Sequence, residues 1–245
     1  MGFREVVFVL AVVCAIDASA DEIPWDPFEP VNRKIYWFND NVDRAVIEPV
    51  AKGYRDIVPD PIKEMVNNFF ENLRYPVYLV SDVAQLKFDQ VGEHTARFML
   101  NSTLGVGGLF DVAARHGHEV HVEDTGTALA YWGMPAGPYL VLPFLGPSNV
   151  RDALGLLADN FLNPLYWVAY KSDDAGTSDR VAYGSTALRV IHSRYELLDA
   201  VETTREGSLD PYTFIQSSYY QYREGLVYDG EPPLGEEDEF EITEE

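Results

Sequence analysis

The stretch GMPAGPYLVLPFLGPSNVRD, residues 133–152, decides much of the fold of this 245-residue chain. It contains four prolines and three glycines, which exclude a long helix, yet its middle, Tyr139 to Leu145, is almost wholly apolar. An apolar segment without helical hydrogen bonds must pair its backbone in a short hairpin or bury it among neighbouring elements. The sequence therefore predicts either an irregular apolar loop enclosed by helices or a buried pair of short strands.

The segments on either side of this stretch have helical periodicity. Ile35, Phe38, Val42 and Val46 recur at spacings of three and four, which predicts one amphipathic helix over residues 31–46. Pro49 is expected to end that helix, and a short helical turn is expected over 50–54. Similar spacing, proline starts and glycine ends predict further helices over residues 60–73, 76–87, 90–104, 109–115, 125–132, 149–161, 179–207 and 210–226. The predicted fold class is therefore all-α.

Composition limits the classes of partner. The chain carries 18 Lys and Arg against 40 Asp and Glu, a formal net charge of −22, which argues against nucleic acid because phosphate binding needs a basic surface. The same charge disfavours electrostatic docking on anionic lipid, so any membrane contact must depend on apolar burial. Residues 229–245 contain nine acids, two prolines and no base, which predicts a disordered acidic tail after a folded domain over 26–228.

The N-terminus has the features of an export signal. Arg4 is followed by an apolar run over residues 6–16 and by Ala18-Ser19-Ala20, an A-x-A cleavage site, so residues 1–20 are predicted to be a signal peptide. Alternatively, Cys14, the only cysteine, is the lipid-modified first residue of a lipoprotein, although the bulky Val13 before it argues against this. In both cases the protein leaves the cytoplasm. We expect no transmembrane helix elsewhere, because charges, Pro or Gly interrupt every apolar stretch.

Candidates for catalysis are few. His116, His118 and His121 lie near Glu119, Glu123 and Asp124, and imidazoles at spacings of two and three can converge on zinc. A loop of this composition is more often simply solvated. A metal-dependent hydrolase built on the three histidines is nevertheless one alternative function, and a soluble periplasmic adaptor is another. The sequence contains neither a G-x-S-x-G nor an H-E-x-x-H motif, so we expect no catalytic or metal residues.

Several motifs in order give the chain a resemblance to a known family. They are DPFEPVNR at 26–33, NFFENL at 68–73, RFMLNSTLG at 97–105, GGLFD at 107–111, GPYLVLP at 137–143, GPS at 146–148 with Arg151-Asp152, LLD at 197–199 and DPY at 210–212. In these motifs the sequence resembles the MlaA (VacJ) family, from about residue 26 to residue 228. The family's usual lipid anchor is where the chain departs from the pattern, because the site around Cys14 is poor.

The resemblance implies a ring of amphipathic helices in the inner leaflet of the Gram-negative outer membrane, on its periplasmic side. Family members remove misplaced phospholipid from the outer leaflet through an amphipathic channel and pass it to a soluble periplasmic carrier, which maintains lipid asymmetry. They associate with trimeric porins and perform no chemistry. The resemblance therefore implies an intermembrane phospholipid transporter without a cofactor.

Two segments are candidates for a lipid path. In the helix over 31–46, Phe38 and Val42 offer an apolar wall beside the polar Asn39 and Asn41. The stretch that follows Gly133 has the properties of a gate, with an apolar middle between glycines that can act as hinges. Its path candidates are Tyr139, Leu140, Leu142 and Phe144, and its hinge candidates are Gly133, Gly137 and Gly146. Ordinary core packing is the alternative reading for both segments.

Overall fold

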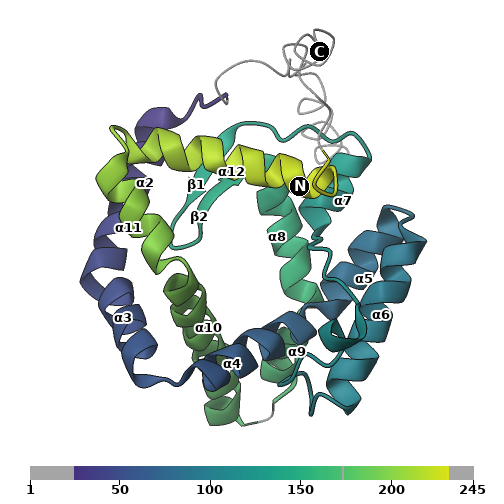
Figure 1. Ribbon diagram of the computed structural model, residues 1–245. Coiled ribbons are helices and arrows are strands. Elements are labelled where there is room, and N and C mark those ends of the chain that lie inside the picture. The colour runs from purple at the N-terminus through teal and green to yellow at the C-terminus, as the bar shows by residue number, and fades with distance from the viewer. Residues whose placement is uncertain (1–24, 173, 232–245) are drawn as a thin grey trace, which may run out of the picture.

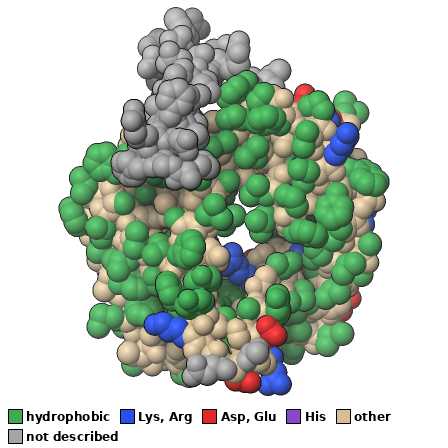
Figure 2. Space-filling model, turned by 180° about the vertical axis from the view of Figure 1, so that it is seen from behind, with side chains coloured by type: hydrophobic (Ala, Val, Ile, Leu, Met, Phe, Trp, Pro, Cys, Tyr) green, Lys and Arg blue, Asp and Glu red, His purple; other side chains and the backbone are tan. Residues whose placement is uncertain are grey.

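The protein is a ring of helices around a central opening (Figure 1). The computed structural model describes residues 25–172 and 174–231. The predicted signal peptide 1–20, Cys14 and residues 232–245 of the predicted tail lie outside the described residues. The opening is still visible when all side chains are drawn (Figure 2). The predicted all-α, ring-like class with one apolar hairpin or loop is confirmed.

The first half of the described chain is built from helices alone. They are α2 (Glu29–Val42), the π-helical turn η1 (Asp43–Ile47), α3 (Glu48–Ile57), α4 (Asp60–Leu73), α5 (Tyr75–Ala84) and α6 (Phe88–Thr103). The second half contains a 3-10 turn η2 (Ala114–His116), α7 (Thr125–Tyr131), strands β1 (Tyr139–Leu142) and β2 (Gly146–Asn149), α8 (Val150–Leu162), α9 (Pro164–Lys171), α10 (Ala175–Glu196), α11 (Leu198–Gly207) and α12 (Pro211–Val227).

Pro49 does not end the first helix, contrary to the prediction. Helix α2 continues through η1 directly into α3, which runs to Ile57. Proline inside a regular helix clashes with the carbonyl four residues before it, here that of Ala45. The wider π turn over Asp43–Ile47 lies where that clash would occur, so the chain bends there and stays helical.

Two other predicted helices differ from the observed elements. Residues 109–115 do not form a helix, because the Asp111 carboxylate accepts the backbone N–H of Ala114 at 3.0 Å and closes a local turn instead. The long helix predicted over 179–207 starts earlier and is divided. Asp174 caps α10 by accepting the Thr177 N–H at 2.8 Å, and the chain changes direction at Leu197, before the buried Leu198.

Two more helices begin at a side-chain cap. Asn149 caps α8 by accepting the Asp152 N–H at 2.8 Å, and Asp210 caps α12 through the Tyr212 N–H at 3.2 Å. Asp60 does not cap α4. It is the first residue of that helix and pairs with Lys63 at 2.7 Å.

The core of the ring is small. Its buried residues Tyr139, Val141 and Tyr212 lie where the hairpin β1–β2 meets α2 and α12, and Ile35 packs against them. Many large apolar side chains are exposed instead, among them Trp37, Phe88, Trp132, Phe161 and Tyr170. Across residues 25–172 and 174–231, none of the helices has both the length and the apolar character needed to span a bilayer.

Candidate functional site

The apolar stretch over residues 133–152 contains a β-hairpin, the second of its two predicted alternatives. Strands β1 and β2 are antiparallel, with Leu142 opposite Gly146 and Tyr139 opposite Asn149. Pro147 lies opposite Val141. Because the sheet has two strands, the missing N–H of Pro147 interrupts no hydrogen bonding within a central strand. The hairpin lies against the inner side of α2 and beneath α12 (Figure 1).

Two asparagines of α2 pair with the second edge of β1. The Asn32 amide donates to the Tyr139 carbonyl at 2.9 Å and accepts the Val141 N–H at 3.0 Å. One side chain thus replaces a neighbouring strand at a position that is almost completely buried. An exposed sheet edge leaves backbone groups unpaired, so this contact removes the main cost of a two-stranded sheet.

Asn39 repeats the arrangement at the tip of the hairpin. Its amide donates to the Leu142 carbonyl at 2.9 Å and accepts the Phe144 N–H at 2.9 Å. Phe144 has φ of 64°, an unfavourable backbone conformation for a residue other than glycine. Its ring packs edge-on against Phe38, with 5.3 Å between ring centroids. The tip is therefore fixed to α2 by one amide and one aromatic pair.

The structure brings some of the predicted path residues together and separates others. Phe38, Asn39, Leu142 and Phe144 form one cluster at the hairpin tip, where Phe144 is 69% exposed. Tyr139 is buried in the core instead. Three other candidates lie outside this cluster. Leu140 and Val42 are half-buried, and Asn41 donates to the Trp37 carbonyl of its own helix at 2.6 Å.

The three predicted hinge glycines all occupy turn positions. Gly133, Gly137 and Gly146 have φ of 82°, 70° and 86°, a region that other residues rarely adopt. A Cβ at Gly137 would approach Val150 to 3.2 Å, whereas Gly133 and Gly146 face open space. The turns thus require glycine for conformational reasons, and hinge motion at them stays a prediction.

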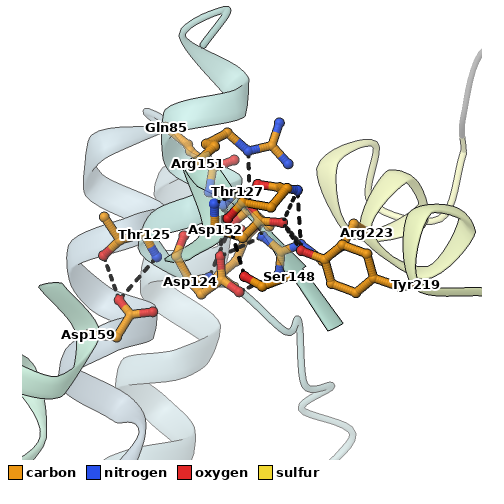
Figure 3. Close-up of polar contacts among 12 residues, drawn as sticks. Gln85, Asp124, Thr125, Thr127, Ser148, Arg151, Asp152, Asp159, Tyr219 and Arg223 are labelled. Carbon is orange, nitrogen blue, oxygen red and sulfur yellow. Dashed lines mark hydrogen bonds and ion pairs between the residues drawn. The ribbon is translucent and has the colours of Figure 1, made fainter. Parts of the chain in front are cut away.

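A buried polar network joins α7, α8 and α12 beside the hairpin (Figure 3). Arg223 donates to Asp124 and to Asp152, with 3.0 Å from its Nη2 to an oxygen of each carboxylate. Asp152 also accepts the Tyr219 hydroxyl at 2.5 Å and the Asn149 amide at 2.8 Å. Burial raises the pKa of Asp124, but the hydrogen bond and charge of Arg223, together with the Thr127 N–H, outweigh burial and bring the pKa below its usual value. This network connects the last helix to the middle of the chain.

Asp159 belongs to the same region but forms no ion pair with a basic side chain of residues 25–172 or 174–231. Its Oδ1 accepts the N–H of Thr125 at 3.1 Å and the Thr125 hydroxyl at 2.5 Å (Figure 3). Burial raises the pKa of Asp159, and the nearby charge of Asp124 raises it further. A carboxyl group with a raised pKa is thus placed on α8.

Basic side chains lie beside the central opening (Figure 2). Arg74, between α4 and α5, stacks on the Tyr78 ring at 5.0 Å, and its Nη1 lies 3.6 Å from Glu71. Arg189 of α10 is exposed to solvent, yet burial among surrounding protein atoms lowers its pKa. Sequence reasoning missed both arginines, because 115 positions separate them and neither belongs to a motif.

The face of the ring shown in Figure 2, which is turned away from the viewer in Figure 1, is covered largely by hydrophobic side chains. The exposed apolar residues come from several helices and from the hairpin tip, and they include Trp37, Val46, Ile57, Phe88, Met99, Trp132, Phe144, Leu145, Leu157 and Phe161. Exposed apolar surface on this scale marks a binding surface for a membrane or a partner. The ring thus combines an apolar exterior with charged groups near its opening.

The histidine cluster does not converge on a metal position. Within the described parts of the chain, no three His, Cys, Asp or Glu side chains come close enough to hold an ion. His116 contacts the Val112 carbonyl, and His118 contacts Glu93 at 2.7 Å. His121 instead donates its backbone N–H to His94 Nε2, and Glu123 is buried against Lys87 at 2.6 Å.

Comparison with known proteins agrees with this architecture. The sequence model of the family described as "MlaA lipoprotein" matches residues 24–225. An Escherichia coli K12 protein named "Intermembrane phospholipid transport system lipoprotein MlaA" is 34% identical over 226 residues, covering 91% of this chain and 86% of that protein. A Rickettsia typhi protein is 37% identical over 204 residues, covering 83% of this chain and 78% of its own length.

A solved structure has the same fold. It comes from work described as "Structural basis for maintenance of bacterial outer membrane lipid asymmetry" and is 32% identical in sequence, with a TM-score of 0.70. The match covers 82% of this chain and 98% of that one. From the family match, these relatives and the shared ring, we conclude that the chain belongs to the MlaA family.

Proposed function

We propose that this protein moves phospholipid through its ring and thereby maintains the lipid asymmetry of a Gram-negative outer membrane. Misplaced phospholipid from the outer leaflet enters the opening and leaves towards the periplasm, without any covalent step. One observation carries the proposal: a hole through a helical ring whose surface exposes many apolar side chains and which has basic side chains beside its opening. A phospholipid needs both surfaces, because its chains avoid water and its headgroup needs polar partners.

We infer that the ring lies in the inner leaflet of the outer membrane, on the periplasmic side. Exposed Trp37, Trp132 and Phe161 support this position, since tryptophan and other aromatic side chains favour the membrane interface. With a net charge of −22, attraction to anionic lipid cannot supply the binding energy, so apolar burial must do so. Peripheral rather than spanning attachment also agrees with the helix lengths in the described chain.

The hairpin tip is the element best suited to gate the path. Phe144 and Leu145 are apolar and exposed, and Phe144 contacts α2 through Asn39 and Phe38. Opening would break few contacts, whereas Tyr139 at the base would remain in the core. We therefore propose that the tip moves and the base does not.

Two partners complete the proposal. A trimeric porin would hold the ring in the outer membrane, and a soluble periplasmic carrier would receive each phospholipid as it leaves. Both partners follow from the family resemblance, and the name of the Escherichia coli relative supports a transport system between membranes. Cross-linking in intact cells, followed by identification of the captured proteins, tests both.

Purification from membranes tests the function itself. The protein should be recovered only with detergent, and mass spectrometry of its extract should find phospholipid in stoichiometric amount. A soluble adaptor or a metal hydrolase would instead fractionate without detergent and carry no lipid. That result would refute the proposal.

An engineered disulfide tests the gate. We propose the double variant Phe38→Cys/Phe144→Cys, because the two rings are in contact. Oxidised protein should lose lipid passage between donor and acceptor vesicles, and reduction should restore it. Each single variant controls for loss of the aromatic pair. Equal transport in the oxidised and reduced double variant, with the cross-link verified, would disprove gating by the tip.

A further inference from the structure

A pocket lies where α4 crosses α10 (Figure 1). Its volume is about 670 Å³, within the range of about 300–1,000 Å³ that is typical of small-molecule sites. Its walls come from three distant parts of the chain, which are residues 60–68 of α4, residues 109–115 and residues 192–196 of α10. The fold, and not one local motif, therefore creates this pocket.

The pocket joins a polar wall to an apolar one. Asp60, Glu64 and Asn68 follow one another at intervals of four on α4, so they share one face of that helix, and all three line the pocket. Leu109 and Phe110 line it from the segment after α6. A phospholipid has the same two parts, because its headgroup is polar and the adjoining chains are apolar. A headgroup and the start of its chains thus match the lining.

His192 gives this pocket an unpaired polar atom. Its side chain lines the pocket from α10 and is only 5% exposed. Its Nδ1 lies 3.2 Å from the Tyr54 hydroxyl, whereas its Nε2 is buried without a hydrogen-bond partner in the described chain. Glu196 Oε1 approaches Nε2 only to 3.5 Å, beyond the usual N–H···O distance. A buried polar atom without a partner is costly and uncommon in folded proteins, so Nε2 indicates a place for a ligand group.

Two charged pairs of the lining are already neutralised. Lys63 Nζ lies 2.7 Å from Asp60 and 4.6 Å from the centroid of the Tyr195 ring. Asp111 lies 2.7 Å from Arg97. A ligand gains little from either pair, because the two charges of each pair cancel.

Three other charged side chains of the lining are available to a ligand. Glu64 and Arg115 are exposed, and neither forms an ion pair within residues 25–172 and 174–231. Glu196 is also exposed, and burial lowers the pKa of its neighbour His192, so the neutral ring does not cancel the charge of Glu196. Two carboxylates and one guanidinium group therefore line the same pocket. A ligand that carries both an ammonium group and a phosphate would complement both signs.

We propose that this pocket binds a zwitterionic phospholipid headgroup, with its phosphate at Arg115 and its ammonium group at Glu64 and Glu196. This inference rests on the proposed function, because it concerns which phospholipid the ring prefers. A guanidinium group binds phosphate through paired hydrogen bonds, and His192 Nε2 can accept one hydrogen bond from the ammonium group. An anionic headgroup offers a phosphate without an ammonium group, and the two carboxylates repel it.

Competition between two lipids measures this preference. Wild type and variants are delipidated in detergent and incubated with vesicles of equal parts phosphatidylethanolamine and phosphatidylglycerol. After recovery of the protein, mass spectrometry gives the ratio of the two bound lipids. We expect wild type to favour the zwitterionic lipid about threefold or more, and the double variant Glu64→Gln/Glu196→Gln to lose this preference. Arg115→Gln should lower the bound amount of both lipids, because both carry a phosphate.

Glu202→Gln/Glu206→Gln is the matched control. Both residues are exposed on α11 four positions apart, neither lines the pocket, and their substitution removes the same two charges. The lipid ratio of this control should equal that of wild type. An equal fall of the ratio in both double variants would show that net charge sets the preference, which would overturn the role of the pocket.

The outcomes separate this inference from the proposed function. Wild type that binds neither lipid would contradict the function. Wild type that binds both lipids in the ratio shown by Glu64→Gln/Glu196→Gln would leave the function standing and overturn the headgroup site. Ethanolamine and inorganic phosphate, each titrated separately into delipidated protein, distinguish the lipid from its soluble parts. Binding of either small molecule as tight as that of phosphatidylethanolamine vesicles would overturn the assignment to lipid.

Discussion

The amide of Asn39 accepts the N–H of Phe144 at 2.9 Å and supports a backbone conformation that phenylalanine rarely adopts. We expect Asn39→Ala to free the hairpin tip without unfolding the ring, because water can reach both backbone groups that lose their partner. Hydrogen exchange at Phe144 should accelerate by about tenfold, consistent with about 1–2 kcal/mol for two partly exposed hydrogen bonds. Asn41→Ala is the control, since Asn41 contacts only the Trp37 carbonyl of its own helix. Unchanged exchange at Phe144 would show that the amide does not fix the tip.

Asn32→Ala, in contrast to Asn39→Ala, should destabilise the whole fold. Asn32 is almost completely buried, so the Tyr139 carbonyl and the Val141 N–H would lose their partner where water cannot replace it. Each buried unpaired backbone group costs about 1–3 kcal/mol, so the free energy of unfolding should fall by about 2–4 kcal/mol. Chemical denaturation monitored by circular dichroism measures this loss. A smaller loss in the free energy of unfolding for Asn32→Ala than for Asn39→Ala would contradict the role of Asn32 in pairing the buried edge of β1.

Glu123 and Glu119 form a matched pair for stability. Glu123 is 1% exposed and bonds to Lys87 at 2.6 Å and to the Gln85 amide at 2.7 Å. Glu123→Ala leaves Lys87 with Asp229 alone and the Gln85 amide without its partner, so we expect a loss of about 3–5 kcal/mol. Glu119→Ala changes an exposed side chain and should shift stability by less than about 0.5 kcal/mol. Thermal melts of both variants provide the comparison. Similar melting temperatures would refute the expected difference in stability between them.

Asp159→Asn should stabilise the protein at neutral pH. An Asn oxygen can accept the same two Thr125 donors, and the substitution removes a charge that burial and Asp124 disfavour. Because the pKa of Asp159 is raised on folding, its contribution to stability is full below its ordinary value of 3.8 and declines as pH rises through the raised value. The gain from Asn should therefore be present at neutral pH and vanish in acid. Melting temperatures of the two proteins across this range check the sign, and a gain that grows in acid would contradict it.

Local signals were enough to predict most of the helices. Proline at the first turn located the starts of α4, α5 and α12, and Ser148 or Asn149 predicted a cap before α8, which Asn149 provides. These signals act within one turn of the chain, so the amino-acid sequence contains them directly. The π-helical turn before Pro49 and the break at Leu197 depend on packing instead, and neither has a marker of its own in the sequence.

The candidate site was predictable only in part. The glycines and prolines of residues 133–152 predicted a non-helical apolar element, but the choice between loop and hairpin depends on partners outside it. Those partners are Asn32 and Asn39, and Asn32 has no local feature that marks it as buried. Their separation by seven positions on a helix was the available signal, since residues so spaced share a face.

The spacing of Asn32 and Asn39 matches two unrelated geometries. Seven helical residues advance about 10.5 Å and return to within about 20° of the starting direction. The backbone groups that the two amides contact are centred on Leu140 and Pro143, and three extended residues span about 10 Å. The distance between the two asparagines along the helix thus matches the distance between their backbone partners along the hairpin. Deleting one residue between the asparagines would turn the second amide away by about 100°. The base of the hairpin would stay bonded to Asn32, whereas the tip would lose its hydrogen bonds to Asn39.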